Sequence, residues 1–209
     1  MAKLLDDVII CCDDQKIIDV AKEFNSRSIL TSKKNKNGTE RIYEAYKKIK
    51  KKYDLIIDIQ GDEPLINPKH IDKVVRFHKK NKSSDIILPH IKISYGDNNN
   101  VVKLLTDIYD NVIYLSRAKL PLEFRQTNKY YKKHLSIISF KPEALKKFNL
   151  FNRTSLEKSE DIELLRALEI GLKIKTLSLY GDSFSIDVFN DYKKAIEKFK
   201  VDKISKKYK

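Results

Sequence analysis

The first 80 residues alternate between short apolar runs and amphipathic segments, and this alternation restricts the fold more than any other feature. Apolar runs bounded by polar residues are typical of strands, whereas apolar residues three and four positions apart are typical of helices. The predicted order is strand 7–12, helix 13–24, strand 28–30, helix 39–51, strand 54–59 and a helix from Pro68. Because helices between strands are typical of a parallel sheet with crossover helices, the sequence predicts an α/β fold.

The second half of the chain departs from this alternation. Three apolar segments follow one another with only turn-like spacers, which indicates an antiparallel insertion or sheet extension. Thr154 and Glu157 then form a capping box, and the helix that they begin runs to Gly171. The predicted elements are strands 85–93, 101–106, 111–116 and 134–140, helix 142–148, helix 154–171, strand 173–179 and helix 189–199.

Helical spacing also predicts which side chains of four helices face the core. The predicted inward residues are Ile17, Val20 and Ala21; Ile42, Tyr46 and Ile49; Ile71, Val74 and Val75; and Phe189, Tyr192, Ile196 and Phe199. Because no linker or low-complexity segment divides the chain, residues 1–209 are predicted to form a single domain.

Composition excludes several classes of protein. The 209 residues are 41% hydrophobic, yet no apolar run approaches the ~20 residues that cross a bilayer, and the start does not resemble a signal peptide. Cys11 and Cys12 are adjacent in a predicted strand, which indicates core residues in a reducing compartment, with the cytoplasm as the default. The net charge is +14, but the lysines are scattered over helices without interleaved aromatic residues. This favours a solvated surface, or one that attracts a small anion, over nucleic-acid binding.

The stretch “DLIIDIQGDEPLI” (54–66) places polar residues directly after a buried strand. Open α/β sheets bind their ligands at the carboxyl ends of their strands. Gly61 permits close approach to the backbone, and the carboxylates of Asp62 and Glu63 suit a metal ion or a polar substrate. The alternative is a polar turn in which Asp62 caps the next helix. This stretch alone does not decide between them.

Four polar clusters lie at the predicted ends of elements. They are “KNGTERI” (36–42), “QGDEP” (60–64), “SRAKLP” (116–121) and “SIDVFNDY” (185–192). Individually, Thr39 and Asp187 can be helix caps and Arg117 can be part of a surface ion pair. Together, Asp62 and Asp187 could share a divalent cation, and the helix that begins near Thr39 favours an anion. This combination indicates nucleotide or phosphate chemistry.

The sequence resembles the 3-deoxy-manno-octulosonate (Kdo) cytidylyltransferases from about Asp7 to Tyr192. The motifs that carry the resemblance, in the family's order and spacing, are “NGTERIYEA”, “IIDIQGDEPLINPKHI”, “LSRAKLP”, “HLSII”, “LEKSEDIELLRALEIGLKI” and “SFSIDVFNDY”. The resemblance implies a nucleotide-diphospho-sugar transferase fold, with a mixed, mostly parallel sheet between helices and a small β-rich part that forms a homodimer. It also implies magnesium-dependent synthesis of CMP-Kdo and pyrophosphate from CTP and the sugar acid, for lipopolysaccharide biosynthesis.

The resemblance also implies roles for individual residues. Asp62 and Asp187 match the catalytic, metal-binding aspartates. The nucleotide side is implied to comprise Thr39, Arg41, Gln60 and Gly61. The sugar side is implied to comprise Arg117, His134, Glu160 and Glu163.

The sequence departs from the family at its start. The family opens with a strand and an “IPARxxSxRLPGKPL” loop that holds the triphosphate, whereas this sequence begins at “MAKLLDDVII”, inside the following helix. We expect residues 1–209 to lack the central strand of the sheet and to have two unpaired strand edges. We also expect little CMP-Kdo synthetase activity from these residues alone, because the charge-assisted contacts to the triphosphate are lost.

Further departures lie on the sugar side and in the strand predicted at 54–59. Asp58 replaces a usual Asn, Leu164 replaces a usual Gln, and “SIISFK” and “IDVFND” replace “GIYGYR” and “VDTPED”. Two alternatives therefore stay open. One is activation of another acid, such as an acylneuraminate or an amino-Kdo, and the other is a non-catalytic binding protein of the same fold.

Overall fold

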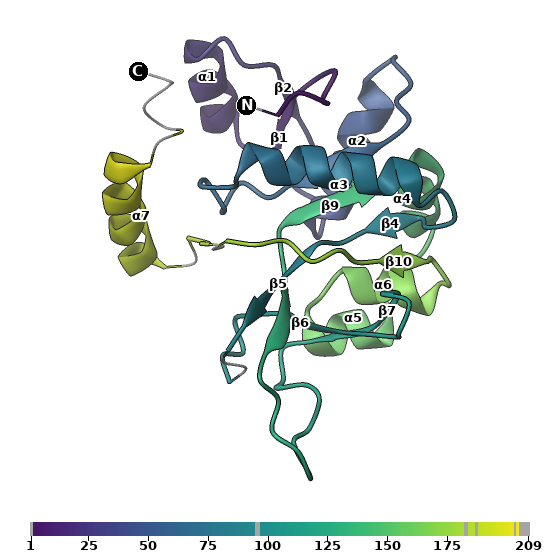
Figure 1. Cartoon of the computed structure of the whole chain (residues 1–209). Coiled ribbons are helices and arrows are strands. Elements are labelled where there is room, and N and C mark those ends of the chain that lie inside the picture. The colour runs from purple at the N-terminus through teal and green to yellow at the C-terminus, as the bar shows by residue number, and fades with distance from the viewer. Residues whose placement is uncertain (1, 95–96, 182–183, 187, 203, 205–209) are drawn as a thin grey trace.

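The computed structural model describes the chain apart from residues 1, 95–96, 182–183, 187, 203 and 205–209, and it has an α/β fold (Figure 1). Strand β1 (Ile10–Cys12) pairs in parallel with β2 (Ser28–Leu30), and helix α1 (Gln15–Glu23) connects them. This unit is the strand–helix–strand crossover that the sequence predicts.

A second sheet forms the centre of the molecule. Its strand order is β10 (Ile174–Lys175), β4 (Ile86–Ile87), β9 (Ile137–Phe140) and β3 (Ile56–Ile59). Strand β9 is antiparallel to both β3 and β4, whereas β10 is parallel to β4. The predicted α/β fold with a mixed sheet is therefore confirmed. The expectation that the sheet is mostly parallel is wrong for the pairings of this sheet, because β9 lies between β3 and β4 and is antiparallel to both.

A third sheet is antiparallel and confirms the predicted insertion. Its strand order is β5 (His90–Ile93), β8 (Tyr131–His134), β6 (Lys103–Thr106) and β7 (Val112–Ser116). The single strand predicted at 134–140 is wrong, because β8 ends at His134 and β9 begins at Ile137. The single strand predicted at 85–93 is wrong as well, because β4 ends at Ile87 in the central sheet and β5 begins at His90 in the third. The chain passes from the third sheet to the central one at this break, where Ser136 Oγ donates a 2.8 Å hydrogen bond to Glu63 Oε1.

The helix predicted at 154–171 is also wrong, because it is two short helices. The remaining helices are α2 (Gly38–Lys48), α3 (Pro68–Lys80), α4 (Pro142–Phe148), α5 (Ser155–Glu160), α6 (Leu164–Glu169) and α7 (Phe189–Val201). Asp161 breaks the segment because its φ is +52°. The carbonyl groups of Glu160 and Asp161 accept hydrogen bonds from the Arg117 side chain, which supports the break. The predicted capping box of Thr154 and Glu157 is confirmed.

Two of the predicted inward faces are wrong. In α1, Ile18 and Ala21 are buried, whereas Ile17 and Val20 are about half exposed. In α7, Ala195 is the buried residue of the helix, and Phe189, Tyr192, Ile196 and Phe199 are all 40% exposed or more. Helix α7 stands apart from the sheets in Figure 1, which agrees with the exposure of its apolar side chains. None of the described helices is both long and apolar enough to cross a membrane.

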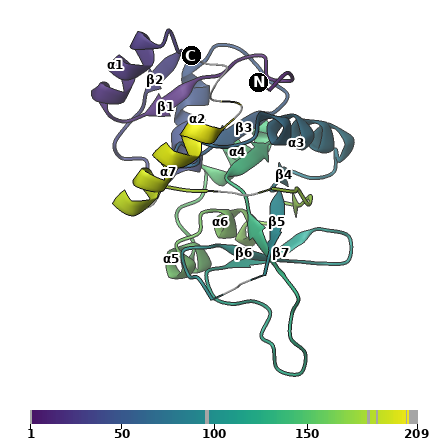
Figure 2. The same cartoon turned by 60° about the vertical axis from the view of Figure 1, so that its left-hand side comes forward.

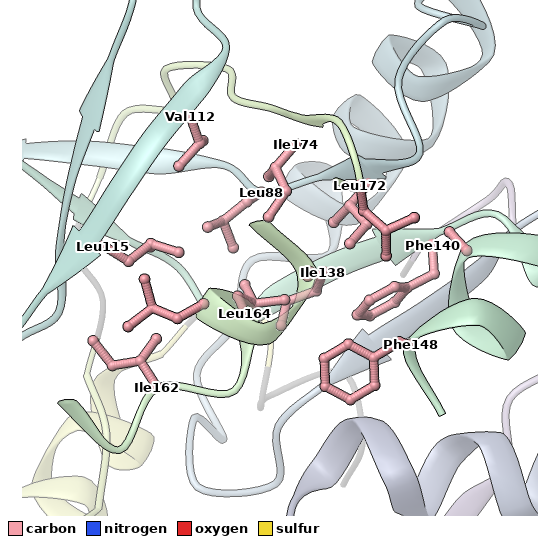
Figure 3. Close-up of a cluster of buried hydrophobic side chains, with 14 of the residues drawn as sticks. Leu88, Val112, Leu115, Ile138, Phe140, Phe148, Ile162, Leu164, Leu172 and Ile174 are labelled. Carbon is pink, nitrogen blue, oxygen red and sulfur yellow. The ribbon is translucent and has the colours of Figure 1, made fainter. Parts of the chain in front are cut away.

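Two apolar clusters hold the central sheet. The larger cluster joins the central and third sheets to α4 and α6, and Figure 3 shows its side chains converging from these elements. Its fully buried members are Ile86, Leu88, Leu115, Phe140, Leu145, Phe148, Leu165 and Ala167. The smaller cluster packs α3 on the sheet, and Ile71, Val74 and Val75 contribute to the buried face as predicted. In β3, Ile56 packs with the larger cluster and Ile57 with the smaller one, so this strand is packed on both faces.

Candidate active site

The carboxyl end of β3 presents the polar turn that the sequence singles out. Gln60 is tied to the neighbouring strand connection by a 3.2 Å hydrogen bond from its amide to the Ser136 carbonyl oxygen. Gly61 has open space around it, and Asp62 is exposed. Helix α3 is capped by Asn67, whose side chain accepts the Lys69 amide. The alternative in which Asp62 caps that helix is therefore wrong.

The loop before α7 meets this turn. The Ile186 amide donates a 2.9 Å hydrogen bond to the Asp62 carbonyl oxygen. Residue 187, the second predicted metal ligand, lies outside the described residues. Among the residues that the structure describes, no three His, Cys, Asp or Glu side chains form a cluster that could hold a metal ion. The structure does show that Ile186, the residue before the second predicted ligand, is in direct contact with Asp62, the first predicted ligand.

Helix α2 begins beside the same strand. Asn37 caps it by accepting the Glu40 amide, and Thr39 is fully buried in its first turn. The Thr39 amide donates to Glu163 Oε2 at 3.1 Å. Arg41, two residues after Thr39 in the same helix, donates to Asp13 Oδ2 at 2.7 Å. The predicted nucleotide residues therefore lie in two places. Thr39 and Arg41 are in the first turn of α2, and Gln60 and Gly61 are in the open turn after β3.

Asp58 is a buried carboxyl group at the centre of this region. Its side chain is 6% exposed, and Oδ2 has no hydrogen-bond partner among the described residues. A Cβ atom on Gly38 would lie 3.7 Å from Asp58 Oδ2 and 3.8 Å from Glu163 Oε1, so the two carboxyl groups converge on that glycine. Burial, followed by the nearby charges of Glu163 and Asp62, raises the pKa of Asp58 to about 7.

Asp58→Asn is expected to remove part of the pH dependence of folding. The folded state retains the Asp58 proton up to about pH 7, whereas the unfolded chain releases it near 3.8, so stability falls as pH rises between these values. At pH 8 the variant should be more stable than the parent protein by up to about 4 kcal/mol. At pH 4 the two proteins should be similar. Urea unfolding across this range measures the difference.

Asp54→Asn is the matched control, because Asp54 is exposed just before the same strand. Glu163, Asp62 and Cys11 also lie near Asp58, and burial raises the pKa of Glu163 as well. A residual pH dependence in Asp58→Asn is therefore expected. If the variant and the parent protein have parallel stability curves from pH 4 to pH 8, the raised pKa is wrong.

Three of the four predicted sugar-side residues, Arg117, His134 and Glu160, lie at the ends of β7, β8 and α5. Glu160 binds the end of β7 through both oxygens, because Oε1 accepts Ser116 Oγ at 2.6 Å and Oε2 accepts the Arg117 amide at 2.9 Å. The Arg117 guanidinium donates to the Glu160 carbonyl oxygen at 2.9 Å. Arg117 is thus fixed against the carboxyl end of α5, and among the described residues it does not form the surface ion pair considered from sequence.

His134 lies at the end of β8 on the same side. Burial of the imidazole, with the nearby charges of Lys133 and Arg117, lowers the pKa of His134 to about 4, so the ring is neutral near pH 7. Its Nδ1 atom is buried and has no hydrogen-bond partner among the described residues. A neutral imidazole with an unused nitrogen can accept or donate one hydrogen bond to a ligand hydroxyl group.

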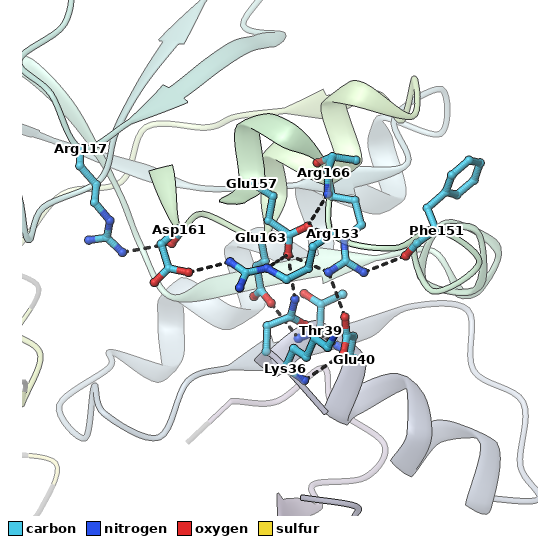
Figure 4. A network of polar contacts seen from close by, with 12 residues as sticks. Lys36, Thr39, Glu40, Arg117, Phe151, Arg153, Glu157, Asp161, Glu163 and Arg166 are labelled. Carbon is cyan, nitrogen blue, oxygen red and sulfur yellow. Dashed lines mark hydrogen bonds and ion pairs between the residues drawn. The ribbon is translucent and has the colours of Figure 1, made fainter. Parts of the chain in front are cut away.

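The resemblance implies that Glu160 and Glu163 both line the sugar side of the site. In the structure they contact different groups. Glu160 contacts Arg117, whereas Glu163 binds the start of α2 through Thr39. Figure 4 shows Glu163 directed towards Thr39, and Arg117 on the other side of Asp161. The structure therefore brings Arg117 and Glu160 together, and it places Glu163 with the nucleotide-side residues.

Sequence reasoning missed the buried ion pair that joins these parts. Arg166 and Glu157 are each about 1% exposed, and the guanidinium of Arg166 donates to both Glu157 oxygens at 2.7 Å. Arg166 also donates to Glu40 Oε1 at 2.9 Å, which connects α6 to the start of α2 (Figure 4). The sequence offered little indication of this buried pair, because a single arginine beside Leu165 in a helix is usually exposed.

Comparison with known proteins gives the family of the chain. Residues 1–174 match the sequence model of a family described as “Cytidylyltransferase”. The 3-deoxy-manno-octulosonate cytidylyltransferase of Fusobacterium nucleatum is 35% identical over 203 residues, which cover 96% of this chain and 82% of that protein. The mitochondrial 3-deoxy-manno-octulosonate cytidylyltransferase of Arabidopsis thaliana is 34% identical over 201 residues, covering 93% and 69% respectively.

Solved structures give the fold. A CMP:2-keto-3-deoxy-manno-octonic acid synthetase in complex with CTP matches with a TM-score of 0.88 at 21% identity, covering 96% of this chain and 84% of that chain. The 4-diphosphocytidyl-2C-methyl-D-erythritol synthase of Anaerococcus prevotii matches with a TM-score of 0.60 at 14% identity, covering 94% and 82%. These neighbours confirm the nucleotide-diphospho-sugar transferase type of fold.

Proposed function

Since this chain belongs to the 3-deoxy-manno-octulosonate cytidylyltransferase family, we propose that it transfers the cytidylyl group of CTP to Kdo, giving CMP-Kdo and pyrophosphate. The observation that carries the proposal is the turn at Asp62, an exposed carboxylate at the carboxyl end of β3 that the loop before α7 contacts through Ile186. Ligands in open α/β sheets bind at such strand ends.

Asp62 and Asp187 would hold Mg²⁺ in this site. Their carboxylate oxygens are the ligand type that this ion prefers. When bound, the ion would neutralise the developing charge on the phosphate oxygens. Gln60 and Gly61 would then border the nucleotide, since the space beside Gly61 admits close approach to the backbone. Arg41 and the helix start at Thr39 complete the proposed nucleotide side.

The sugar acid would bind near Arg117 and His134. Arg117 supplies a cation for the sugar carboxylate, and Glu160 fixes its orientation. His134 is neutral and has a free ring nitrogen within the described structure, which suits hydrogen bonding to a hydroxyl group. The reaction itself is in-line attack of the sugar hydroxyl on the α-phosphorus, so positioning and charge neutralisation dominate.

We also propose a homodimer that acts in cytoplasmic lipopolysaccharide biosynthesis.

Pyrophosphate release tests this function. It should be measured with CTP, Mg²⁺ and Kdo for residues 1–209, and again for a fusion that places the family's first strand and loop before Asp7. Release that requires both CTP and Kdo supports the proposal. An acylneuraminate and an amino-Kdo serve as alternative acceptors. If pyrophosphate release is faster with the acylneuraminate or the amino-Kdo than with Kdo, that acid is the substrate. If neither the 209-residue protein nor the fusion releases pyrophosphate with any of the three acids, the proposed function is wrong.

A further inference from the structure

The buried carboxylate of Glu157 contacts two parts of the molecule at once. Its oxygens accept hydrogen bonds from the Arg166 guanidinium at 2.7 Å, and Oε1 also accepts the side-chain amide of Asn37 at 3.2 Å. Figure 2 shows α5 and α6 beside β6 and β7 of the third sheet. Asn37 instead lies just before α2. The contact between Glu157 and Asn37 therefore joins the elements beside the third sheet to the helix of the nucleotide side.

This contact determines which way the Asn37 side chain faces. An ionised carboxylate has acceptor atoms only, so the part of Asn37 that faces Glu157 must be its NH₂ group. The Oδ1 atom of Asn37 is thereby turned towards α2, where it accepts the Glu40 amide at 2.9 Å. If the side-chain amide were reversed, two oxygens would face each other at Glu157 and two donors would face each other at Glu40. A single orientation of Asn37 thus satisfies both neighbours.

The first turn of α2 is held by side chains from distant segments. The first amides of a helix have no partner within the helix itself. The Thr39 amide bonds Glu163 Oε2 at 3.1 Å. The Glu40 side chain bonds Arg166, which also binds Glu157 (Figure 4). The start of the helix therefore depends on one group of charged side chains from α5, α6 and the residue between them.

The same short helix also holds the sugar side of the site. Glu160, three residues after Glu157, accepts the Ser116 hydroxyl group and the Arg117 amide at the end of β7. Helix α5 thus presents one carboxylate to the start of α2 and another to the third sheet. A change at the contact between Glu157 and Asn37 should therefore affect the nucleotide side and spare Arg117.

We propose that Glu157 is a positioning residue of the nucleotide side. It fixes the orientation of the Asn37 amide, and through this cap it holds Thr39 and Arg41 in the arrangement that receives CTP. The identity of the ligand rests on the proposed function, whereas the effect on the cap is a property of the chain alone. Residue 37 must offer a donor to Glu157 and an acceptor to the helix.

Asn37→Asp separates this role from the general rules for helix caps. Aspartate caps helices as well as asparagine does, and its charge suits a helix start, so those rules predict equal or better protection. We expect the opposite, because the new carboxylate has no donor for Glu157. In the 209-residue chain, amide hydrogen exchange at Glu40 should become about tenfold faster or more. Exchange at Val74 and Val75 of α3 should stay unchanged.

Asn67→Asp is the matched control, because Asn67 caps α3 in the same way. Its side chain accepts the Lys69 amide at 3.0 Å. Within the described part of the chain, the side-chain amide of Asn67 donates no hydrogen bond, so a carboxylate there has no acceptor to face. Exchange at Lys69 should therefore stay the same or become slower.

Adding Glu157→Gln to Asn37→Asp tests the partnership of the two residues. The glutamine side chain can donate to the new carboxylate at residue 37 and still accept from Arg166. We expect exchange at Glu40 in this double variant to return to within about threefold of the parent protein. If the double variant does not fold, Asn37→Asp and its Asn67→Asp control decide the question.

Enzyme kinetics extend the test to the ligand, in the protein form that makes CMP-Kdo. Asn37→Asp should raise the KM for CTP about tenfold, whereas the KM for Kdo should stay within about twofold, because Glu160 still holds Arg117. The double variant keeps the new carboxylate, so recovery of the KM for CTP there excludes direct repulsion of the nucleotide. If no protein form makes CMP-Kdo, the proposed function is wrong, and the exchange measurements still decide whether Glu157 positions the cap.

Three results would overturn the proposal. The first is exchange at Glu40 in Asn37→Asp that is as slow as in the parent protein. The second is a folded double variant in which Glu40 exchanges as fast as in Asn37→Asp. The third is an equal rise in the KM values for CTP and Kdo, since that would assign Glu157 a general structural role.

Discussion

Asp62→Asn is expected to reduce pyrophosphate release by about a thousandfold in the protein form that makes CMP-Kdo. A metal ion at a transferring phosphate contributes several kcal/mol, and about 1.4 kcal/mol corresponds to each factor of ten in rate. An amide keeps the size of the carboxylate but loses its charge. Because Asp62 is exposed, the free energy of unfolding should change by less than about 0.5 kcal/mol.

Asp19→Asn is the control for this variant, since Asp19 is an exposed carboxylate on α1 that pairs with Lys22. It should leave turnover unchanged. A magnesium titration adds a second readout, because loss of a ligand should raise the Mg²⁺ concentration that gives half-maximal rate. If Asp62→Asn is fully active and reaches half-maximal rate at the same Mg²⁺ concentration as the parent protein, Asp62 is not a metal ligand.

Arg166→Ala should be the most destabilising single change among those considered. Removal of Arg166 takes away the two 2.7 Å hydrogen bonds to the buried carboxylate of Glu157 and leaves it with the longer 3.4 Å ion pair to Arg153. It also releases Glu40 and the Phe151 carbonyl group. Breaking one side of a buried ion pair costs about 3–5 kcal/mol. The guanidinium also stacks 4.2 Å above the Phe148 ring, and that packing is lost too. Chemical denaturation at pH 7 measures the loss.

Arg76→Ala provides the comparison, because Arg76 is exposed on α3. Its effect should stay within about 0.5 kcal/mol. A second variant, Arg166→Met, keeps much of the volume and separates packing from charge. If Arg166→Met restores most of the stability that Arg166→Ala loses, the ion pair contributes little and packing on Phe148 explains the effect.

The sequence predicts the order of elements well where the periodicity is regular. The strand–helix alternation of the first 80 residues depends on local spacing, and the structure confirms it. The failures occur where tertiary contacts override spacing. The segment 154–171 has an unbroken helical pattern, yet Arg117 takes the carbonyl groups of Glu160 and Asp161, and α5 ends there. Helix α7 has an apolar stripe, but the spacing of apolar residues along the sequence does not indicate which element packs against that stripe.

The candidate site was only partly predictable for a similar reason. The turn at Asp62 is readable because a polar cluster follows an apolar strand. The convergence of Asp58 and Glu163 on Gly38 joins residues more than 100 positions apart, and no local pattern indicates it. The same holds for Arg166 and Glu157 with Glu40. A carboxyl group inside a strand is visible in the sequence, but its unpaired state follows only from the three-dimensional arrangement.

The contact between Arg166 and Glu40 has a consequence for synthesis of the chain on the ribosome. The two residues are 126 positions apart. At about 5–20 residues per second, Glu40 is translated roughly 6–25 s before its partner. During that interval the start of α2 lacks the ion pair that fixes it to α6. Nascent chains that stop before Arg166 should therefore remain sensitive to protease at residues 37–40, and a ribosome-stalled series on either side of Arg166 would locate the step at which this segment becomes protected.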